Sequence, residues 1–427
     1  MLKQYSFKSL TAADIEKLVA RNTDATHTIQ DTVLQIMDDV RLRGDRSLHE
    51  FALKFDKVTL EKLYLEKDDI EALAATITRD QQRALEIAFQ NIHKFHSSQL
   101  RKERVVETMP GVACWREVRP IEKVGLYIPG GSAVLPSTLL MLGVPARIAG
   151  CKEIVVCSPP QHTGKINGFV AYCLQLLKIE KIYLVGGAQA VAAMAYGTEN
   201  VPKVDKIFGP GNQFVTKAKS MVQSMVNVSI DMPAGPSEVL VVADHTAQPA
   251  FVAADLLAQA EHGPDSQAVL VATSASIIKR VNEELKKQLG VLPRAEIANM
   301  AIKNSYAVEV TDLHEALDFS NQYAPEHLIL ETDEWKSLLP RITNAGSVFL
   351  GHLTPESAGD YASGTNHTLP TSGYARSYSG VSVDSFVKKI TFQHISPDGL
   401  RHIGSTVETL AELEGLHAHK NAISIRK

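Results

Sequence analysis

The stretch VGLYIPGGSAVLPSTLLMLG at residues 124–143 contains the pattern that decides the fold. A short β-rich run leads into a turn of glycine and proline, and the turn leads into a helical run. The pattern recurs as EIVVCSPP at 153–160 with INGFVAYCLQLLK at 166–178, and again as KIYLVGGAQAVAAMAYG at 181–197. Strands that alternate with helices of this length predict βαβ crossovers and a parallel sheet. Residues 121–235 are therefore expected to form an α/β lobe, a candidate for nucleotide binding.

A second alternation of strands and helices begins at SEVLVVAD, residues 237–244. Helical periodicity follows in PAFVAADLLAQAEHG at 249–263, and further β-rich and helical runs continue to GSVFLG at 346–351. No low-complexity linker or long-period repeat interrupts the chain. This region predicts another parallel α/β lobe.

The two ends of the chain have a mainly helical pattern. Apolar residues recur at helical spacing in 28–55 and 69–96, whereas residues 111–131 have the texture of extended structure. The predicted fold class is α/β, with two lobes of parallel sheet and helical ends. We predict a helical N-terminal segment (1–25), a discontinuous first lobe (26–120 and 236–380), a second lobe (121–235) and a helical C-terminal tail (381–427).

The composition is that of an ordinary globular protein, with 44% apolar residues among 427. Lys and Arg total 44 against 48 Asp and Glu, so the formal net charge of −4 is too balanced for a general binder of nucleic acid or membranes. The expected partner is therefore a small molecule. Neither a signal peptide nor a membrane-spanning stretch is apparent, which predicts a cytoplasmic protein.

Four cysteines, Cys114, Cys151, Cys157 and Cys173, show neither CxxC spacing nor the density of a disulfide scaffold. Their neighbours have the pattern of buried strands and helices. Structural thiols in a reducing cytosol are the favoured interpretation. A catalytic cysteine is the alternative.

A first candidate site lies in QAEHGPD, where Gln259 and His262 stand three residues apart at the end of a helical run. Both side chains project from one face of that helix. An amide oxygen and an imidazole can ligate a metal, although this pair is far less specific than HExxH. The alternative is a capped, hydrogen-bonded helix end.

A second candidate is APEHLILE, which sets Glu326 and His327 side by side just before an apolar strand. A carboxylate and an imidazole near one pocket can divide acid and base work, since histidine titrates near neutral pH. An exposed polar turn is the alternative.

A third candidate is the long polar loop PESAGDYASGTNHTLPTSG at 355–373, which offers Asp360 and His367. Long loops in compact domains are often functional, and Asp360 could ligate a metal or bond its own backbone. In the tail, Glu414, His417 and His419 are by themselves typical of a solvated terminal helix. They become site candidates only in combination with the earlier residues.

Three glycine-rich turns precede helices: YIPGGSA at 127–133, LVGGAQA at 184–190 and IFGPGNQF at 207–214. Such turns can present backbone N–H groups and a helix N-terminus to phosphate. None fits GxGxxG, so a dinucleotide site and plain chain reversal both remain open.

Taken together, these motifs resemble one family, histidinol dehydrogenase. So many ordered matches, spread over about three hundred residues, make coincidence implausible, whereas any one motif would be weak evidence. The matching segments are GLYIPGG, LVGGAQAVAAMAYGT, KIFGPGNQFV, DMPAGPSEVLV, LLAQAEHGPDSQAVL, NQYAPEHLIL, AGSVFLG, TPESAGDYASGTNHTLPT and EGLHAHKNA.

The resemblance implies that one zinc ion per site is held by Gln259, His262 and Asp360 of one subunit and by His419 from the partner subunit. The AHKN pattern of the family falls on His419 and not on His417. The chain would then form a homodimer with shared active sites, completed by its helical tails. The implied substrate-binding residues are Ser237, Gln259, His262, His327, Asp360, Glu414 and His419.

The implied reaction is the last part of histidine biosynthesis, the oxidation of L-histidinol through L-histidinal to L-histidine with two NAD. His327 would remove the hydroxyl proton, and Glu326 would help to hydrate the aldehyde. The implied NAD contacts are Tyr127, Gln189 and Asn212, in lobes that are Rossmann-like without the usual fingerprint.

Two other classes of protein share parts of this pattern. A zinc hydrolase would use the same kinds of ligand with a metal-bound water and would need no NAD. A non-catalytic metal-binding or scaffold protein would show no turnover.

Overall fold

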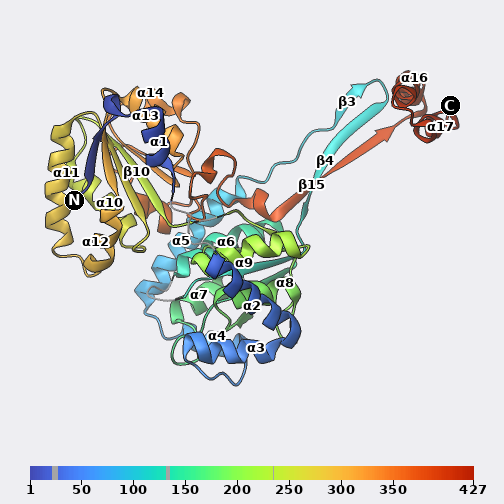
Figure 1. Cartoon of the computed structure of the whole chain (residues 1–427). Coiled ribbons are helices and arrows are strands. Elements are labelled where there is room, and N and C mark those ends of the chain that lie inside the picture. Colours follow the sequence, from blue (N-terminus) through green and yellow to red (C-terminus); the bar gives the residue numbers. More distant parts are fainter. Residues whose placement is uncertain (22–26, 131–134, 234) are drawn as a thin grey trace.

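The computed structural model describes residues 1–21, 27–130, 135–233 and 235–427. The chain forms two α/β lobes and a long arm that carries the C-terminus (Figure 1). A six-stranded sheet organises each lobe, and a three-stranded antiparallel sheet organises the arm. The predicted α/β class with parallel sheets is confirmed. Within the described residues, no helix combines the length and apolar character needed to cross a membrane.

The first lobe has a parallel sheet, and its helices cover both faces. Every residue of β10 is buried, as expected for a strand of a parallel sheet packed on both sides. In sheet order the strands are β1 (Lys3–Ser6), β12 (Tyr306–Glu309), β11 (Gln267–Ala272), β10 (Glu238–Ala243), β13 (His327–Glu331) and β14 (Ser347–Leu350). Helices α10 (Pro249–Ala260), α11 (Ala275–Leu289) and α12 (Ala295–Lys303) cover one face, and α1 (Ala12–Val19), α13 (Leu313–Tyr323) and α14 (Trp335–Leu338) cover the other.

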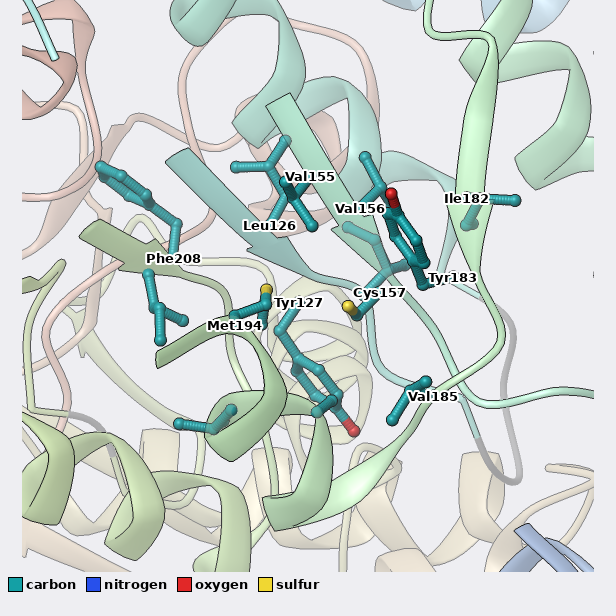
Figure 2. Packing of buried hydrophobic residues seen from close by; sticks show 14 of the residues in the cluster. Leu126, Tyr127, Val155, Val156, Cys157, Ile182, Tyr183, Val185, Met194 and Phe208 are labelled. Carbon is teal, nitrogen blue, oxygen red and sulfur yellow. The ribbon is translucent and has the colours of Figure 1, made fainter. Parts of the chain in front are cut away.

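The second lobe repeats this topology, with β2 added antiparallel at one edge. Its strands in sheet order are β2 (Tyr64–Glu66), β7 (Lys181–Tyr183), β6 (Glu153–Cys157), β5 (Lys123–Tyr127), β8 (Lys206–Phe208) and β9 (Ser229–Ile230). Figure 2 shows side chains of β5, β6, β7 and β8 packed together with Met194 of α8. The helices are α2 (His27–Arg43), α3 (Asp45–Phe51), α4 (Lys67–Ala74), α5 (Arg79–Ser97), α6 (Pro136–Ala149), α7 (Gly168–Leu176), α8 (Gly187–Tyr196) and α9 (Gln213–Met225).

Both sheets have the strand order of a doubly wound fold. Counted along the chain from β10 in one lobe and from β5 in the other, five parallel strands of each sheet run 3-2-1-4-5, and β1 adds a sixth parallel strand to the first sheet. The order reverses between β10 and β13 in the first lobe and between β5 and β8 in the second. Ligands of such sheets commonly bind at this switch point, outside the carboxyl ends of the strands.

The arm projects away from both lobes (Figure 1). Its long strands β4 (Val112–Pro120) and β15 (Val387–Ile395) pair antiparallel over their full lengths, and β3 (Val106–Met109) adds to β4. Two helices, α16 (Pro397–Leu413) and α17 (His417–Ser424), form its tip and pack on each other.

Short helical turns complete the described elements. Most lie in the connections between longer elements, and α15 holds part of the loop that follows β14. They are α15 (Glu356–Tyr361), the 3₁₀ turns Phe7–Ser9, Leu339–Arg341, Tyr374–Arg376 and Val383–Phe386, and the π-helical turn Ala52–Asp56.

Two of the predicted segments, the N-terminal segment and the tail, differ from the structure. The N-terminal segment is not wholly helical, because residues 3–6 form β1, which pairs with β12. The tail is not wholly helical either, because residues 387–395 form a strand of the arm. Residues 22–26, which include the predicted boundary at 25, and residues 131–134 of the first glycine-rich turn lie outside the described residues.

The assignment of residues 26–120 to the first lobe is also wrong. Apolar residues of α2, α4 and α5 belong to the same buried cluster as the strands of the second lobe. These helices are amphipathic. An apolar face predicts that a helix packs against a partner, but it does not predict which sheet that partner belongs to. The extended pattern predicted after Gly111 is confirmed by β4 and β5.

Candidate active site

Glu326 and His327 lie at the amino end of β13, which is flanked by β10 and β14 in the first sheet. Their exposed fractions are only 6% and 3%. Ala324, with a φ of 53°, turns the chain sharply just before them. The alternative of an exposed polar turn is therefore wrong, because both side chains point into the protein.

The ring of His327 is oriented by a backbone acceptor. Its Nδ1 lies 3.1 Å from the carbonyl oxygen of Glu238, the first residue of β10. A carbonyl can only accept, so this contact keeps a proton on Nδ1. The other nitrogen, Nε2, is buried without a hydrogen bond and lies 3.6 Å from Oδ1 of Asp360. The basic nitrogen of His327 thus faces the group of carboxylates beside it.

Carboxylates dominate the electrostatics around this histidine. Burial alone would lower the pKa of His327, but Glu356, Glu326 and Asp360 raise it well above its usual value. Burial raises the pKa of Glu326 to about 8, although His327 opposes the shift. For Asp360, burial opposes ionisation, but the neighbouring His327 holds the pKa below the usual range. Glu326 can therefore hold or release a proton near neutral pH.

Glu356 is a member of this group that the sequence patterns did not single out. It is almost fully buried, and neither carboxylate oxygen has a hydrogen-bond partner among the described residues. One oxygen lies 3.8 Å from Nδ1 of His327. The i, i+4 spacing of Glu356 and Asp360 was the available signal, because it puts both carboxylates on one face of a helix. Such orphaned oxygens can accept hydrogen bonds from a cationic ligand.

Gln259 and His262 lie where α10 ends, also at the amino edge of the first sheet. Nε2 of Gln259 is 3.2 Å from Nδ1 of His262, and Oε1 of Gln259 is buried without a hydrogen bond. Burial lowers the pKa of His262, and nearby Asp360 opposes that shift. A neutral imidazole, an orphaned amide oxygen and a carboxylate therefore converge here.

This donor set suits a metal ion. Zinc accepts imidazole and oxygen donors, and catalytic sites commonly use three protein ligands and leave a position open. Among the described residues, His327, Glu356 and Asp360 also have donor atoms within 4.8 Å of one another. The residues present fit a divalent cation bound between α10 and α15.

The loop after Asp360 connects the site to the second lobe. Nδ1 of His367 lies 3.0 Å from the carbonyl oxygen of Asp360, and its Nε2 lies 3.3 Å from Oγ1 of Thr138 in α6. Asn366 donates a hydrogen bond to the carbonyl of Met141 in the same helix. The candidate metal site therefore adjoins the start of α6, which follows β5 of the second lobe.

Ser237 precedes β10 and is half-buried at the same edge as Glu326. Its carbonyl accepts a hydrogen bond of 3.1 Å from the N–H of Gln267, the first residue of β11. Ser237 directly precedes Glu238 in the sequence, and the backbone of Glu238 contacts both Glu326 and His327.

The candidate NAD contacts lie at the carboxyl edge of the second sheet, around its switch point. Tyr127 ends β5, and its hydroxyl accepts a 3.2 Å hydrogen bond from the N–H of Gly187. Gln189 is buried in the first turn of α8. Asn212 caps α9, with its Oδ1 accepting from Phe214 and Val215. Of the three, Asn212 is exposed.

A cavity of about 360 Å³ opens beside this edge. It lies next to the residues that follow β5 and β6, and Asp56 of the π-helical turn contributes a carboxylate to it. Burial raises the pKa of Asp56 to about 6. Its lining residues include Phe55, Asp56, Gly130, Ser158, Pro159 and His162.

Glu414, His417 and His419 are not brought to this site within one chain. All three are exposed at the tip of the arm, which projects away from the first lobe (Figure 1). Of the four predicted metal ligands, Gln259, His262 and Asp360 therefore lie together, whereas His419 lies apart on the arm.

The cysteines are distant from the group around His327. Cys157 is packed among the strands of the second lobe in Figure 2, and Cys151 and Cys173 are buried too. Burial raises the pKa of Cys151 to about 11 and that of Cys157 and Cys173 further. Cys114 is half-buried on the arm. Thiols with such raised pKa values are poor nucleophiles at neutral pH.

Comparison with known proteins assigns the family. A sequence model of histidinol dehydrogenase matches residues 19–427. Histidinol dehydrogenase of Bacteroides thetaiotaomicron is 55% identical over 414 residues, which cover 97% of this chain and 96% of that protein. The chloroplastic enzyme of Arabidopsis thaliana is 51% identical over 430 residues, covering 100% and 91%.

A solved structure agrees. The crystal structure of histidinol dehydrogenase from Elizabethkingia anophelis superposes with a TM-score of 0.96 at 49% identity, and it covers 100% of this chain and 98% of that one. The agreement extends over both lobes and the arm. The chain therefore belongs to the histidinol dehydrogenase family of NAD-dependent oxidoreductases.

Proposed function

We propose that this protein oxidises L-histidinol to L-histidinal and then to L-histidine, with two NAD reduced in each turnover. The observation that carries the proposal is the position of His327, whose free Nε2 faces Asp360 next to the donors Gln259 and His262. A proton acceptor and a metal-binding set thus share one buried site. Such a pairing suits the oxidation of a substrate that is held through its nitrogen atoms.

Gln259, His262 and Asp360 would hold a zinc ion, joined by His419 from the partner subunit. When bound, the zinc would act as a template that ligates the substrate amine and imidazole and so orients the carbinol carbon. The orphaned oxygen of Gln259 and the lowered pKa of His262 support this assignment, because both leave a donor ready for a cation. Ser237, with Glu414 from the partner subunit, would complete the substrate pocket.

In its neutral form, His327 would take the hydroxyl proton at Nε2 during the first oxidation and a proton of the hydrated aldehyde during the second. Glu326 would help to hydrate the aldehyde by accepting a proton from water. Its pKa of about 8 supports a role as a proton acceptor and donor near neutral pH. Burial of both side chains keeps bulk water from the intermediate.

NAD would accept the hydride in each step, bound at the carboxyl edge of the second sheet by Tyr127, Gln189 and Asn212. The switch point between β5 and β8 supports this location. The cavity beside Gly130 and Ser158 offers room for part of the dinucleotide. His367, which bridges Asp360 and Thr138, connects this edge with the metal donors.

The chain would form a homodimer in which each arm completes the partner's site. Apolar side chains on the arm support this, because a second copy would cover them. Leu413 is 78% exposed, and Val105, Val106, Leu410, Leu416 and Ile425 are exposed as well.

The cytoplasm is the proposed location, which suits four unpaired cysteines.

A stoichiometric assay tests the proposal. Purified, zinc-loaded protein should reduce two NAD for each histidinol consumed and should release histidine. One NAD per histidinol, with histidinal accumulating, would contradict the second oxidation. Turnover of other substrates without NAD would indicate a hydrolase, and no turnover at all would leave only a metal-binding protein.

A further inference from the structure

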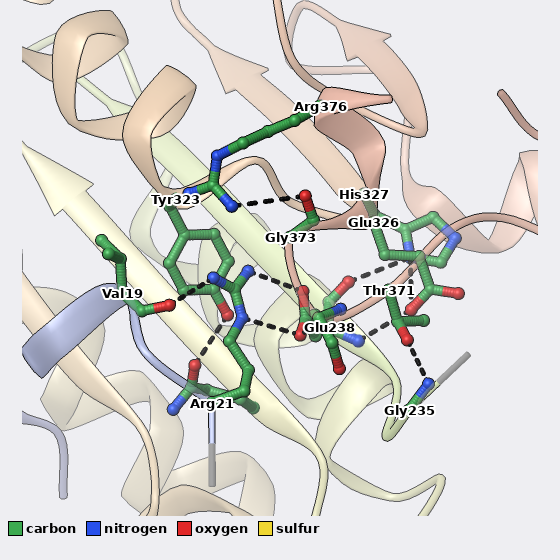
Figure 3. Close-up of polar contacts among 12 residues, drawn as sticks. Val19, Arg21, Gly235, Glu238, Tyr323, Glu326, His327, Thr371, Gly373 and Arg376 are labelled. Carbon is green, nitrogen blue, oxygen red and sulfur yellow. Dashed lines mark hydrogen bonds and ion pairs between the residues drawn. The ribbon is translucent and has the colours of Figure 1, made fainter. Parts of the chain in front are cut away.

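Arg21 and Glu238 form a buried ion pair next to Glu326 and His327 in the first lobe. Nε and Nη2 of Arg21 donate to the two carboxylate oxygens of Glu238, each at 2.9 Å (Figure 3). The side chains are only 9% and 2% exposed. Two parallel bonds of this kind fix the relative orientation of the two groups as well as their distance.

Arg21 makes two further contacts besides the ion pair. Its Nη1 donates to the carbonyl oxygen of Val19, and its guanidinium lies 3.7 Å from the centre of the Tyr323 ring. The Tyr323 hydroxyl in turn donates a 2.7 Å hydrogen bond to Gln267. A planar guanidinium is required for this combination of stacking and paired hydrogen bonds, and a lysine could not provide it.

Glu238 contacts both catalytic residues through its backbone. Its N–H donates a 2.8 Å hydrogen bond to Oε2 of Glu326, and its carbonyl oxygen lies 3.1 Å from Nδ1 of His327. The side chain that binds Arg21 therefore belongs to the residue whose peptide groups orient both proton-transferring groups.

The same carboxylate also binds the loop that follows His367. Oε1 of Glu238 accepts a 2.9 Å hydrogen bond from the N–H of Ser372. Ser372 has a φ of 54°, a left-handed conformation that residues other than glycine adopt rarely. Next to it, Thr371 accepts a hydrogen bond from the N–H of Gly235 (Figure 3). The ion pair thus joins the N-terminal segment, the start of β10 and this loop.

We propose that Arg21 and Glu238 are positioning residues that hold the start of β10, so that Glu326 and His327 keep their reactive orientation. A buried ion pair contributes little net stability, and apolar replacements are often as stable. We expect the ion pair to act through orientation and not through stability. If the Glu238 peptide moved, Glu326 would lose the N–H that donates to it, and His327 would lose the carbonyl that accepts from it. The assignment rests on the proposed roles of these two residues.

The test compares the double variant Arg21→Met/Glu238→Met with Tyr306→Phe. The double variant removes both charges together, which avoids leaving one buried and unpaired. Tyr306→Phe is the matched control, because its hydroxyl anchors the same N-terminal segment by donating its hydrogen bond to the carbonyl of Leu18 and not to the Glu238 carboxylate. Thermal unfolding would be measured for each protein.

In the double variant kcat should fall roughly tenfold or more for both histidinol and histidinal, since small displacements of reacting groups carry large rate penalties. The KM for NAD and the zinc content should stay unchanged. Tyr306→Phe should keep its kcat even if it unfolds at a lower temperature. A double variant that folds and retains a kcat within twofold of the original protein would overturn the assignment.

A measurement without turnover separates this proposal from the proposed reaction. The Nδ1–H proton of His327, identified by its absence in His327→Asn, should give a hydrogen-bonded NMR signal in the original protein and in Tyr306→Phe. It should shift or broaden in the double variant. An unchanged signal would also overturn the positioning role, whatever reaction the protein catalyses.

Discussion

Nδ1 of His327 lies 3.1 Å from the carbonyl oxygen of Glu238, so a backbone acceptor on one central strand orients the side chain of its neighbour. This contact leaves Nε2 as the nitrogen that can take a proton from a substrate. Glu326 is oriented by the N–H of the same Glu238. Two adjacent side chains with different tasks thus depend on one peptide segment.

The division of labour between these two residues predicts different losses. Glu326→Gln should impair mainly the oxidation of histidinal, because only that step consumes water. His327→Asn should impair both oxidations by roughly a hundredfold or more, since both transfer protons. Rates measured separately with histidinol and with histidinal check this. Equal losses in both steps for Glu326→Gln would remove the basis for separate roles.

Metal removal should abolish activity, and added zinc should restore it. His262→Asn should behave like the metal-free protein because it removes a ligand at the end of α10. His245→Asn is the matched control, since His245 is exposed in the same lobe. Activity would be followed together with metal content by elemental analysis. Full activity in protein shown to be free of metal would contradict the assignment.

Replacement of all four cysteines by alanine or serine should leave histidinal oxidation intact. Aldehyde oxidation can proceed through a thiohemiacetal, but the raised pKa values of Cys151, Cys157 and Cys173 oppose thiolate formation. Unfolding measurements would identify any variant that loses stability through a cavity at Cys157. Selective loss of histidinal oxidation on a single cysteine-to-alanine change, in folded protein, would implicate a covalent intermediate.

Mixing two inactive variants tests the shared active site. If His419 reaches the partner's site, dimers of His262→Asn with His419→Asn contain one intact site and one doubly defective site. Random assembly should then restore about a quarter of the original activity. No recovery in samples that mass spectrometry shows to contain mixed dimers would place His419 in its own subunit's site or outside the site.

Asp255 predicts a pH-dependent stability. Burial in α10, with a contribution from Glu331, raises its pKa to about 7. The folded state therefore holds a proton that the unfolded state loses near pH 4, and this stabilisation is lost as the pH rises through 7. Relative to Asp255→Asn, the original protein should lose roughly 1–3 kcal/mol between pH 5 and pH 8.

Thermal unfolding at the two pH values measures this effect. Asp318→Asn is the control, because Asp318 lies exposed on α13 in the same lobe and should show no such trend. A constant difference between the original protein and Asp255→Asn at both pH values would show that Asp255 is ionised in the folded state throughout.

Local patterns in the sequence determined the kinds of element and several of the site residues. Repeated strand, glycine turn and helix units predicted the parallel sheets, and the three-residue spacing predicted a shared face for Gln259 and His262. These features depend on periodicity and backbone conformation, which a short segment specifies by itself. The assignment of zinc, NAD and substrate came from the resemblance to a family.

Only the tertiary structure decided which distant segments meet. It pairs β1 with β12, packs α2 on the second lobe, and joins Arg21 to Glu238 across 217 positions. It also buries Glu356 without a hydrogen-bond partner beside His327, and it holds His419 on the arm away from its own lobe. An apolar face or a charged side chain requires a partner, but many partners satisfy the same local requirement. The choice among them comes from the packing of the whole chain.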